Sequence, residues 1–328
     1  MEFHYKIRPG RYRHFKGGEY EVLGMAHHSE TEEELVVYRT LYGDHDLWVR
    51  PAAMWCETVE RDAESNPALP TSGSERMKIV DRFGSRPGAE LVRLPQGGER
   101  LLAVEHAAAL LVNEQTAFRV VCTPELLPQL ALGRLLTEGW IASADEVEQV
   151  AVCAEGLKVS VHLTHPLAAA PAAGQEVPSC CTDNLTVASP VVLRQLAPVP
   201  QLDVPEAWVG TLAAAMGGEL PLYRATRAVH SCFLLRAGRI LYQCEDLGRH
   251  NALDKAVGCA LADGVPLGEC VLYTSGRVPV DMVRKAIRAG VPALVSKTMP
   301  TVQSVELAEE YGLRLLIQKK NEFHARIS

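Results

Sequence analysis

Polar side chains crowd into one short segment near the C-terminus, residues 245–255. Directly after an apolar run, this segment brings together Arg249, His250, Asn251, Asp254 and Lys255. Cations of this kind bind diphosphate, and a carboxylate or amide can read the edge of a guanine base or a ribose. The alternative is a capped and solvated helix start, in which Asp246 or Asn251 bonds the backbone and the charges face water. The pattern alone leaves both interpretations open.

A second polar turn lies further along the chain, at Ser275, Gly276 and Arg277. Its small residues expose the backbone ahead of an expected helix, which is a geometry that suits an anion. Upstream, His230 is a further site candidate, with a satisfied core histidine as the alternative. These residues extend the candidate binding chemistry beyond a single segment.

Both polar segments are predicted to lie where a strand passes into a helix. Apolar runs at residues 239–244 and 270–273 predict strands, and apolar residues at helical spacing predict helices at 250–262 and 281–289. In open α/β sheets ligands bind at this edge, because backbone N–H groups and the helix dipole point outward there.

The alternation of strands and helices continues to the end of the chain. It predicts a parallel or mixed sheet covered by helices, with further elements at residues 291–296, 301–311 and 313–318.

Four motifs in one order resemble the formate dehydrogenase accessory sulfurtransferase family. They are VVCTPELLPQLALGRLLTEGWIAS (120–143), EDLGRHNALDKAVG (245–258), TSGRVPVDMVRKAIRAGVPAL (274–294) and SVELAEEYGLRLL (304–316). The resemblance runs from about Glu75 to Ser328 and implies a cytidine-deaminase-like α/β fold with a mixed sheet, as a homodimer. It also implies transfer of sulfur from a cysteine desulfurase to the molybdenum bis-guanine-dinucleotide cofactor, for activation of formate dehydrogenase.

In this resemblance the cofactor is a bound substrate, and its GDP-like end is held at the polar junctions. The residues expected to bind it are His230, Arg249, His250, Asn251, Asp254, Lys255, Ser275, Gly276 and Arg277. Arg227, Ala228 and Val229 precede His230 where relatives usually show glycines, which predicts a more crowded pocket.

The family carries sulfur on a mobile loop, expected here at about residues 165–185, with two cysteines separated by two residues. This chain has Cys180 at the first cysteine position and Asp183 at the second, with Cys181 between them. A carrier needs one accessible thiolate to attack the donor persulfide and hold the terminal sulfur, so Cys180 can act alone. Cys181 can resolve a persulfide into a vicinal disulfide, and both thiols are catalytic candidates.

The other cysteines in the family-like region have a different context. They lie in apolar runs and are predicted to be core residues: Cys122, Cys153, Cys232, Cys244, Cys259 and Cys270. No second pair of Cys or His recurs at ligand spacing, so no metal site is expected. The zinc-ligand pattern of a deaminase, with its partner Glu, is absent as well.

Two other functions stay open beside the sulfurtransferase. One is a non-catalytic chaperone that binds the molybdenum cofactor without carrying sulfur. The other keeps the scaffold but delivers sulfur or selenium to another molybdoenzyme, with the vicinal thiols and Asp183 as a new site. Binding of guanosine diphosphate without sulfur transfer distinguishes the first alternative.

Composition sets the outer limits. A chain of 328 residues with 47% hydrophobic content can bury a large core in more than one domain. No apolar run approaches the ~20 residues that span a bilayer, and the first residues lack the pattern of a signal peptide. Nine cysteines, an odd number, favour a reducing cytoplasm. A net charge of -7 offers no general surface for nucleic acid.

The first sixty residues have a different character. Short apolar runs at residues 22–27, 34–39 and 47–50 predict strands of a small all-β, SH3-like barrel spanning residues 1–60. The patterns YRHFKGGEYEVLG and LWVRPAAMW resemble a bacterial domain family of unknown function. Residues 61–75 are polar and rich in turn formers, which indicates a linker ahead of the sulfurtransferase-like domain at 76–328.

Overall fold

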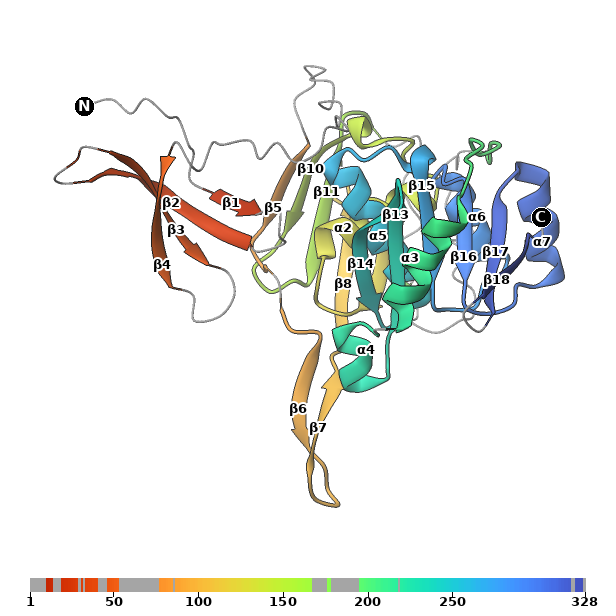
Figure 1. Cartoon of the computed structure of the whole chain (residues 1–328), viewed down its shortest axis with the longest axis horizontal. Helices are drawn as coiled ribbons and strands as arrows, with labels where there is room; N and C mark the ends of the chain where they lie inside the picture. The colour runs from red at the N-terminus through yellow and green to blue at the C-terminus, as the bar shows by residue number, and fades with distance from the viewer. Residues whose placement is uncertain are drawn as a thin grey trace. The chain divides into compact units, whose positions relative to one another are not determined.

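The chain folds as two compact units, Met1–Ser72 and Gly73–Ser328. A computed structural model describes residues 10–13, 19–28, 31, 33–40, 46–52, 77–84, 86–166, 176–177, 195–217, 219–319 and 322–326. Figure 1 shows the elements along the chain. The whole of the expected linker, residues 61–75, lies outside these residues, as do Cys180 and Cys181.

The described part of the N-terminal unit contains a four-stranded β-sheet, and its β character was predicted from the sequence. Its strands pair antiparallel in chain order: β1 Gly10–Arg13, β2 Glu19–His27, β3 Glu34–Thr40 and β4 Leu47–Pro51. Val22, Val36 and Ala52 form its buried core, and Tyr38 packs against them. Trp48 on β4 is 53% exposed, so Tyr38 contributes to the core of this unit whereas Trp48 does not.

The second unit contains two six-stranded sheets. The first sheet has the order β12-β9-β8-β11-β10-β5 and mixes parallel with antiparallel pairs. Its strands are β5 Lys78–Asp81, β8 His106–Val112, β9 Gln115–Cys122, β10 Val147–Val152, β11 Lys158–Leu163 and β12 Glu176–Val177. Strands β6 Ala89–Arg93 and β7 Glu99–Ala103 form a separate antiparallel hairpin.

The second sheet has the order β14-β13-β15-β16-β17-β18. Its strands are β13 His230–Arg236, β14 Arg239–Asp246, β15 Cys270–Thr274, β16 Ala293–Ser296, β17 Arg314–Lys319 and β18 Glu322–Arg326. Strands β15, β16 and β17 run parallel, while β13 runs antiparallel to both β14 and β15. The start of β13 and the ends of β14, β15 and β16 therefore meet at one edge.

Two helices lie between the two sheets. Helix α2 contacts strands of the first sheet, α5 contacts strands of the second, and the two helices pack on each other (Figure 1). The helices are α2 Leu127–Thr137, α3 Glu206–Gly217, α4 Pro221–Thr226, α5 Arg249–Asp263, α6 Val280–Arg288 and α7 Val302–Tyr311, with 3-10 turns at Ala144–Glu146 and Leu267–Glu269. In the described part of the chain, none of them has the length and apolarity of a bilayer-spanning segment.

Strands β13, β15 and β16 are buried on both faces, which explains why they read as continuous apolar runs. Successive side chains of a strand point to opposite faces. On β15, Leu272 joins the main core toward α5, whereas Val271 and Tyr273 belong to a smaller cluster with Leu212 of α3. The mixed α/β fold and the expected C-terminal strands and helices are thereby confirmed.

Two glycines set the distance between α2 and α5. A Cβ atom on Gly133 would lie 1.7 Å from the carbonyl oxygen of Asp254, and one on Gly258 would lie 1.8 Å from that of Gln129. Each position therefore has room for glycine only, and the helix backbones touch directly. This close approach brings charged side chains of both helices together.

A buried ion network lies beside the helix crossing. The carboxylate of Asp254 accepts hydrogen bonds from Thr137 Oγ1 at 2.6 Å, from Lys285 Nζ at 2.9 Å and from Arg134 Nη1 at 3.3 Å. Lys285 of α6 also pairs with Glu138 at 2.8 Å. Because these charges are removed from water, they depend on each other for compensation. The network joins α2, α5 and α6.

Enlarging either glycine at the crossing should destabilise the fold. Gly133→Ala or Gly258→Ala forces a methyl group against backbone, and we expect a loss of roughly 3 kcal/mol in the free energy of unfolding. Gly210→Ala in α3 is the matched control, because a Cβ there meets nothing within 4 Å. That variant should gain up to about 1 kcal/mol from helix propensity. Urea unfolding checks all three, and equal stability of Gly133→Ala and the native chain would contradict the close crossing.

Glu138 should make the protein sensitive to acid. Burial alone raises the pKa of its carboxyl group, but Lys285 and Arg134 lower it from the ordinary 4.5 to about 2. The unfolded chain binds this proton at higher pH than the folded protein does. The ionised carboxylate of Glu138 therefore contributes about 3 kcal/mol to the free energy of unfolding. This contribution is complete above pH 4.5 and is lost as the pH falls toward 2.

The test compares unfolding of Glu138→Gln with that of the native chain at neutral pH and near pH 3. We expect the free energy of unfolding of Glu138→Gln to be lower than that of the native chain at neutral pH. The difference should shrink in acid, because the native carboxylate is then protonated and no longer stabilises the fold by its charge. Glu148→Gln changes an exposed carboxylate of β10 and serves as the control, with no change expected at either pH. A deficit that is independent of pH would exclude the ionic contribution.

Candidate functional site

Asp246, the last residue of β14, organises the sheet edge. Its Oδ1 accepts hydrogen bonds from the backbone N–H of Gly248 at 3.0 Å and from Asn251 Nδ2 at 2.9 Å. Its Oδ2 accepts from the N–H of Thr123 at 3.0 Å and pairs with Lys255 Nζ at 2.7 Å. The carboxylate thus joins the turn before α5, the helix itself and the segment after β9.

Lys255 and Asn251 complete this buried arrangement. The ammonium group of Lys255 donates to Thr123 Oγ1 at 2.6 Å in addition to its ion pair. Burial alone lowers the pKa of Lys255, but Asp246 outweighs burial and the pKa is raised. Asn251 Nδ2 also donates to the carbonyl of Val121 at 2.9 Å. The ammonium group of Lys255 and the side-chain N–H groups of Asn251 therefore bond partners inside the protein.

Three residues predicted from sequence to contact a nucleotide are buried and paired within the fold. Lys255 and Asp254 are fully buried, and Asn251 is 5% exposed. These contacts correspond to the structural interpretation of a helix start bonded to its own backbone and core, and binding by these residues stays a prediction. The physical reason is that each of them meets an opposite charge or a main-chain group within the fold.

His250 and Arg249 lie beside this network at the first turn of α5. His250 Nε2 is 2.7 Å from Asp281 Oδ2 of α6. Burial lowers the pKa of His250, so the neutral ring donates its N–H to the carboxylate. Burial alone raises the pKa of Asp281, but the hydrogen bond from His250 lowers it overall. Sequence reasoning assigned no site role to Asp281, because its partner lies in a different helix.

The turn at Ser275 and Gly276 is packed more tightly than its sequence suggests. A Cβ atom on Gly276 would lie 2.7 Å from Cβ of Arg249. The N–H of Ser275 donates to the carbonyl of Ser231 at 2.9 Å, and that of Gly276 donates to Thr274 Oγ1 at 3.1 Å. These two N–H groups are therefore already hydrogen-bonded within the fold.

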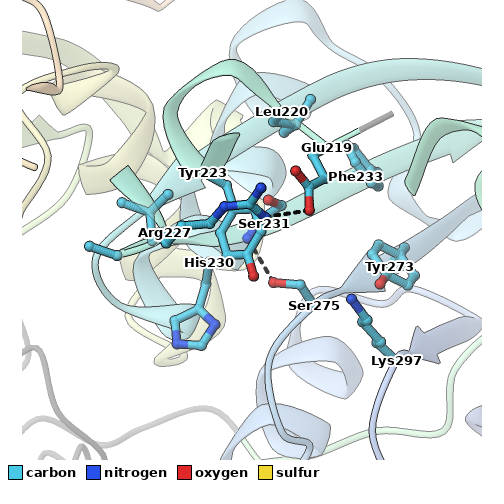
Figure 2. A pocket seen from close by; sticks show the side chains of 12 residues that line it. Glu219, Leu220, Tyr223, Arg227, His230, Ser231, Phe233, Tyr273, Ser275 and Lys297 are labelled. Carbon is cyan, nitrogen blue, oxygen red and sulfur yellow. Dashed lines mark hydrogen bonds and ion pairs between the residues drawn. The ribbon is translucent and has the colours of Figure 1, made fainter. Parts of the chain in front are cut away.

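A cavity of about 560 Å³ opens at the same edge of the second sheet, on the face that carries α4 (Figure 2). Its volume lies within the range of small-molecule sites. The lining side chains come from α4 and its flanks and from the ends of β13, β15 and β16: Glu219, Leu220, Tyr223, Arg227, Ala228, Val229, His230, Ser231, Phe233, Tyr273, Ser275 and Lys297.

The wall formed by α4 carries opposite charges at its two ends. Arg227, which caps the end of α4, pairs with Glu219 through Nη1 and Oε1 at 2.5 Å, and its guanidinium lies 5.1 Å from the centre of the Tyr223 ring. Arg227 has a positive φ of 56°, a conformation that glycine adopts without strain. Where glycines are expected before His230, this chain therefore has a charged and aromatic wall.

Of the residues predicted from sequence, His230 and Ser275 line this cavity. Burial lowers the pKa of His230, with Arg249 and His250 adding to the shift, so its ring is neutral at pH 7. Arg277 is exposed and does not belong to the lining. Sequence reasoning missed Glu219, Tyr223, Tyr273 and Lys297. Tyr273 and Lys297 could have been found from the sequence, because each lies at the end of one of two neighbouring parallel strands, where ligands commonly bind.

The cysteines divide into described and undescribed groups. Cys122, Cys232, Cys244 and Cys270 are buried, as predicted, whereas Cys153 and Cys259 are partly exposed. Burial raises the pKa of Cys122 and of Cys270 to about 12, so neither forms a thiolate at neutral pH. The catalytic candidates Cys180 and Cys181 lie outside the described residues.

Known proteins resemble this chain over most of its length. A sulfur carrier protein FdhD from Nocardia farcinica (strain IFM 10152) is 33% identical over 248 residues, covering 69% of this chain and 87% of that protein. A sulfur carrier protein FdhD from Listeria monocytogenes serotype 4b (strain F2365) is 29% identical over 220 residues, covering 66% and 84%.

A solved structure resembles the fold as well. The crystal structure from Desulfotalea psychrophila, described as a formate dehydrogenase accessory protein, superimposes with a TM-score of 0.56 at 26% identity, covering 71% of this chain and 92% of that one. Residues 10–84 match the model of a family of proteins of unknown function, DUF1653. Residues 103–324 match the FdhD/NarQ family model. The chain therefore belongs to the FdhD/NarQ family.

Proposed function

We propose that this protein carries sulfur from a cysteine desulfurase to the molybdenum bis-guanine-dinucleotide cofactor of formate dehydrogenase or another molybdoenzyme. The observation that carries the nucleotide part is the 560 Å³ cavity at the sheet edge. Its lining offers two cations, Arg227 and Lys297, in a protein whose net charge is -7. Local cations and aromatic rings suit a nucleoside diphosphate, and we assign the guanine nucleotide end of the cofactor to this cavity.

Support for Cys180 as the carrier comes from the remaining thiols. Only a thiolate attacks a persulfide, and the buried cysteines are held as thiols by their raised pKa values. Cys180 holds the first cysteine position of the family-like motif. In the proposed step its thiolate attacks the terminal sulfur of the donor persulfide. The donor S–S bond breaks, a new S–S bond forms on Cys180, and the desulfurase leaves as a thiolate.

Sulfur loading should depend on Cys180. Intact-protein mass spectrometry after incubation with a cysteine desulfurase and cysteine should show one added sulfur atom that a thiol reductant removes. Cys180→Ala should gain none and Cys181→Ala should show a smaller effect. Cys153→Ala, which removes a partly exposed thiol elsewhere, should load as the native chain does. Undiminished loading of Cys180→Ala would refute the proposed carrier.

Guanosine diphosphate should bind the native chain and raise its melting temperature, because a ligand that binds only the folded state stabilises it. Ala228→Trp fills the cavity from an exposed position and should weaken binding at least about tenfold, measured by calorimetry. Ala154→Trp adds the same side chain to an exposed turn outside the cavity and should bind normally. Normal binding by Ala228→Trp would place the nucleotide elsewhere.

The two experiments together also separate the chaperone alternative. Nucleotide binding without any sulfur on the native chain indicates a protein that holds the cofactor and carries no sulfur. This alternative is considered because Asp183 replaces the second cysteine of the family's sulfur-carrying motif.

A further inference from the structure

Tyr273 is the most unusual residue of the cavity lining. It lies near the end of β15, and its ring stacks on Phe233 of β13 with centroids 5.4 Å apart and an interplanar angle of 21°. The side chain is 1% exposed. Because the next strand residue, Thr274, points to the opposite face, the ring of Tyr273 belongs to the outer face of the sheet, where the cavity lies.

The phenol group of Tyr273 has no hydrogen-bond partner among the residues that the structure describes. Burial raises its pKa, so the group stays protonated and can donate a hydrogen bond at neutral pH. A buried hydroxyl without a partner costs free energy, which a ligand acceptor in the cavity would recover. By contrast, the hydroxyl of Tyr242 has a partner within the protein, because it donates a hydrogen bond to Asp263 Oδ2 at 2.6 Å.

Two further donors share this side of the cavity. Lys297 directly follows β16, and its backbone N–H donates to the carbonyl of Thr274 at 3.2 Å, which places it beside the end of β15. Ser275 Oγ accepts from the N–H of Ser231 at 2.9 Å, so its own O–H remains to be donated. In Figure 2, Tyr273 and Lys297 lie on one side of the cavity, and Tyr223 and Arg227 lie on the other.

The two sides therefore differ in chemistry. The side of Tyr273, Ser275 and Lys297 offers donors and a cation, which match phosphate oxygens. The part of the lining at α4 offers the carboxylate of Glu219, which pairs with Arg227, and the ring of Tyr223. A carboxylate accepts from the two N–H groups on one edge of guanine, and an aromatic ring stacks on a base. The pairing of Glu219 with Arg227 leaves acceptor capacity, because a carboxylate has about four lone-pair positions.

We propose that Tyr273, with Ser275 and Lys297, forms the phosphate subsite of this cavity, while Glu219 and Tyr223 receive the guanine base. The proposal rests on the nucleotide-binding function proposed above and adds the direction in which the nucleotide lies. It makes the Tyr273 hydroxyl a ligand-binding group whose hydrogen bond forms only in the complex.

The test measures binding of guanosine diphosphate and of guanosine to the full chain by calorimetry. Tyr273→Phe removes one oxygen atom and should weaken the diphosphate about tenfold while leaving guanosine unchanged. Lys297→Ala should weaken the diphosphate selectively as well. Glu219→Gln should weaken both ligands by the same factor, because they share the base.

A second readout excludes a purely structural role for the hydroxyl. Without ligand, Tyr273→Phe should melt at the native temperature or above it, since it removes a buried group that has no partner. Tyr242→Phe is the matched control, because it breaks the bond to Asp263 and should melt lower while binding both ligands normally. A lower melting temperature for Tyr273→Phe, with native binding, would overturn the proposal.

Other outcomes are equally decisive. Equal weakening of guanosine and its diphosphate by Tyr273→Phe would place the base beside Tyr273 and reverse the proposed direction. If the native chain binds neither ligand, the nucleotide-binding function itself fails, and the subsite fails with it. If the native chain binds both and Tyr273→Phe binds both unchanged, the nucleotide function stands and only the subsite is wrong.

Discussion

The carboxylate of Asp246 is the interaction on which the rest of the structure depends. It lies at the end of β14 in the second sheet, yet it bonds the segment after β9 of the first sheet and the start of α5. Its charge is balanced by Lys255, one helical turn and a half into α5. A buried carboxylate is stable only with several donors and a cation, so losing one partner leaves the others uncompensated. This requirement fixes both sheets and the helix at one point.

The interface of α2 and α5 holds the neighbouring elements in place beside Asp246. Glycines bring the helix backbones into contact, and the ion network around Asp254 and Lys285 ties α6 to the same pair. Buried ion pairs add little net stability, because desolvation offsets their attraction, but they tolerate few alternative arrangements. The sheet edge above them is thus held in place by groups that never reach the surface.

The cavity uses the opposite face of the same edge. Antiparallel β13 and parallel β15 and β16 bring His230, Ser275 and Lys297 together although they are distant in sequence. Each of the three follows or begins a strand that is buried on both faces, so its backbone is well anchored. The α4 segment adds a wall with a charge pair and a ring, which sequence patterns around His230 indicated only as crowding.

The sequence by itself determined the mixed α/β class, the C-terminal strands and helices, the all-β N-terminal unit and the family. Local apolar spacing, glycine stops and ordered motifs suffice for these, because they depend on neighbours in the chain. Only the tertiary structure decided which polar groups are buried and paired and which line the cavity. The sequence pattern suggested Asp254 and Lys255 as binding residues, whereas in the structure they bond Arg134 and Thr123 from distant segments, and Lys255 also pairs with the nearby Asp246. In the sequence, Tyr273 is an ordinary residue of an apolar strand. In the structure, the packing of β13 and β15 buries its hydroxyl without a partner among the described residues. Burial and pairing are properties of the packed chain, so no pattern within one segment could reveal them.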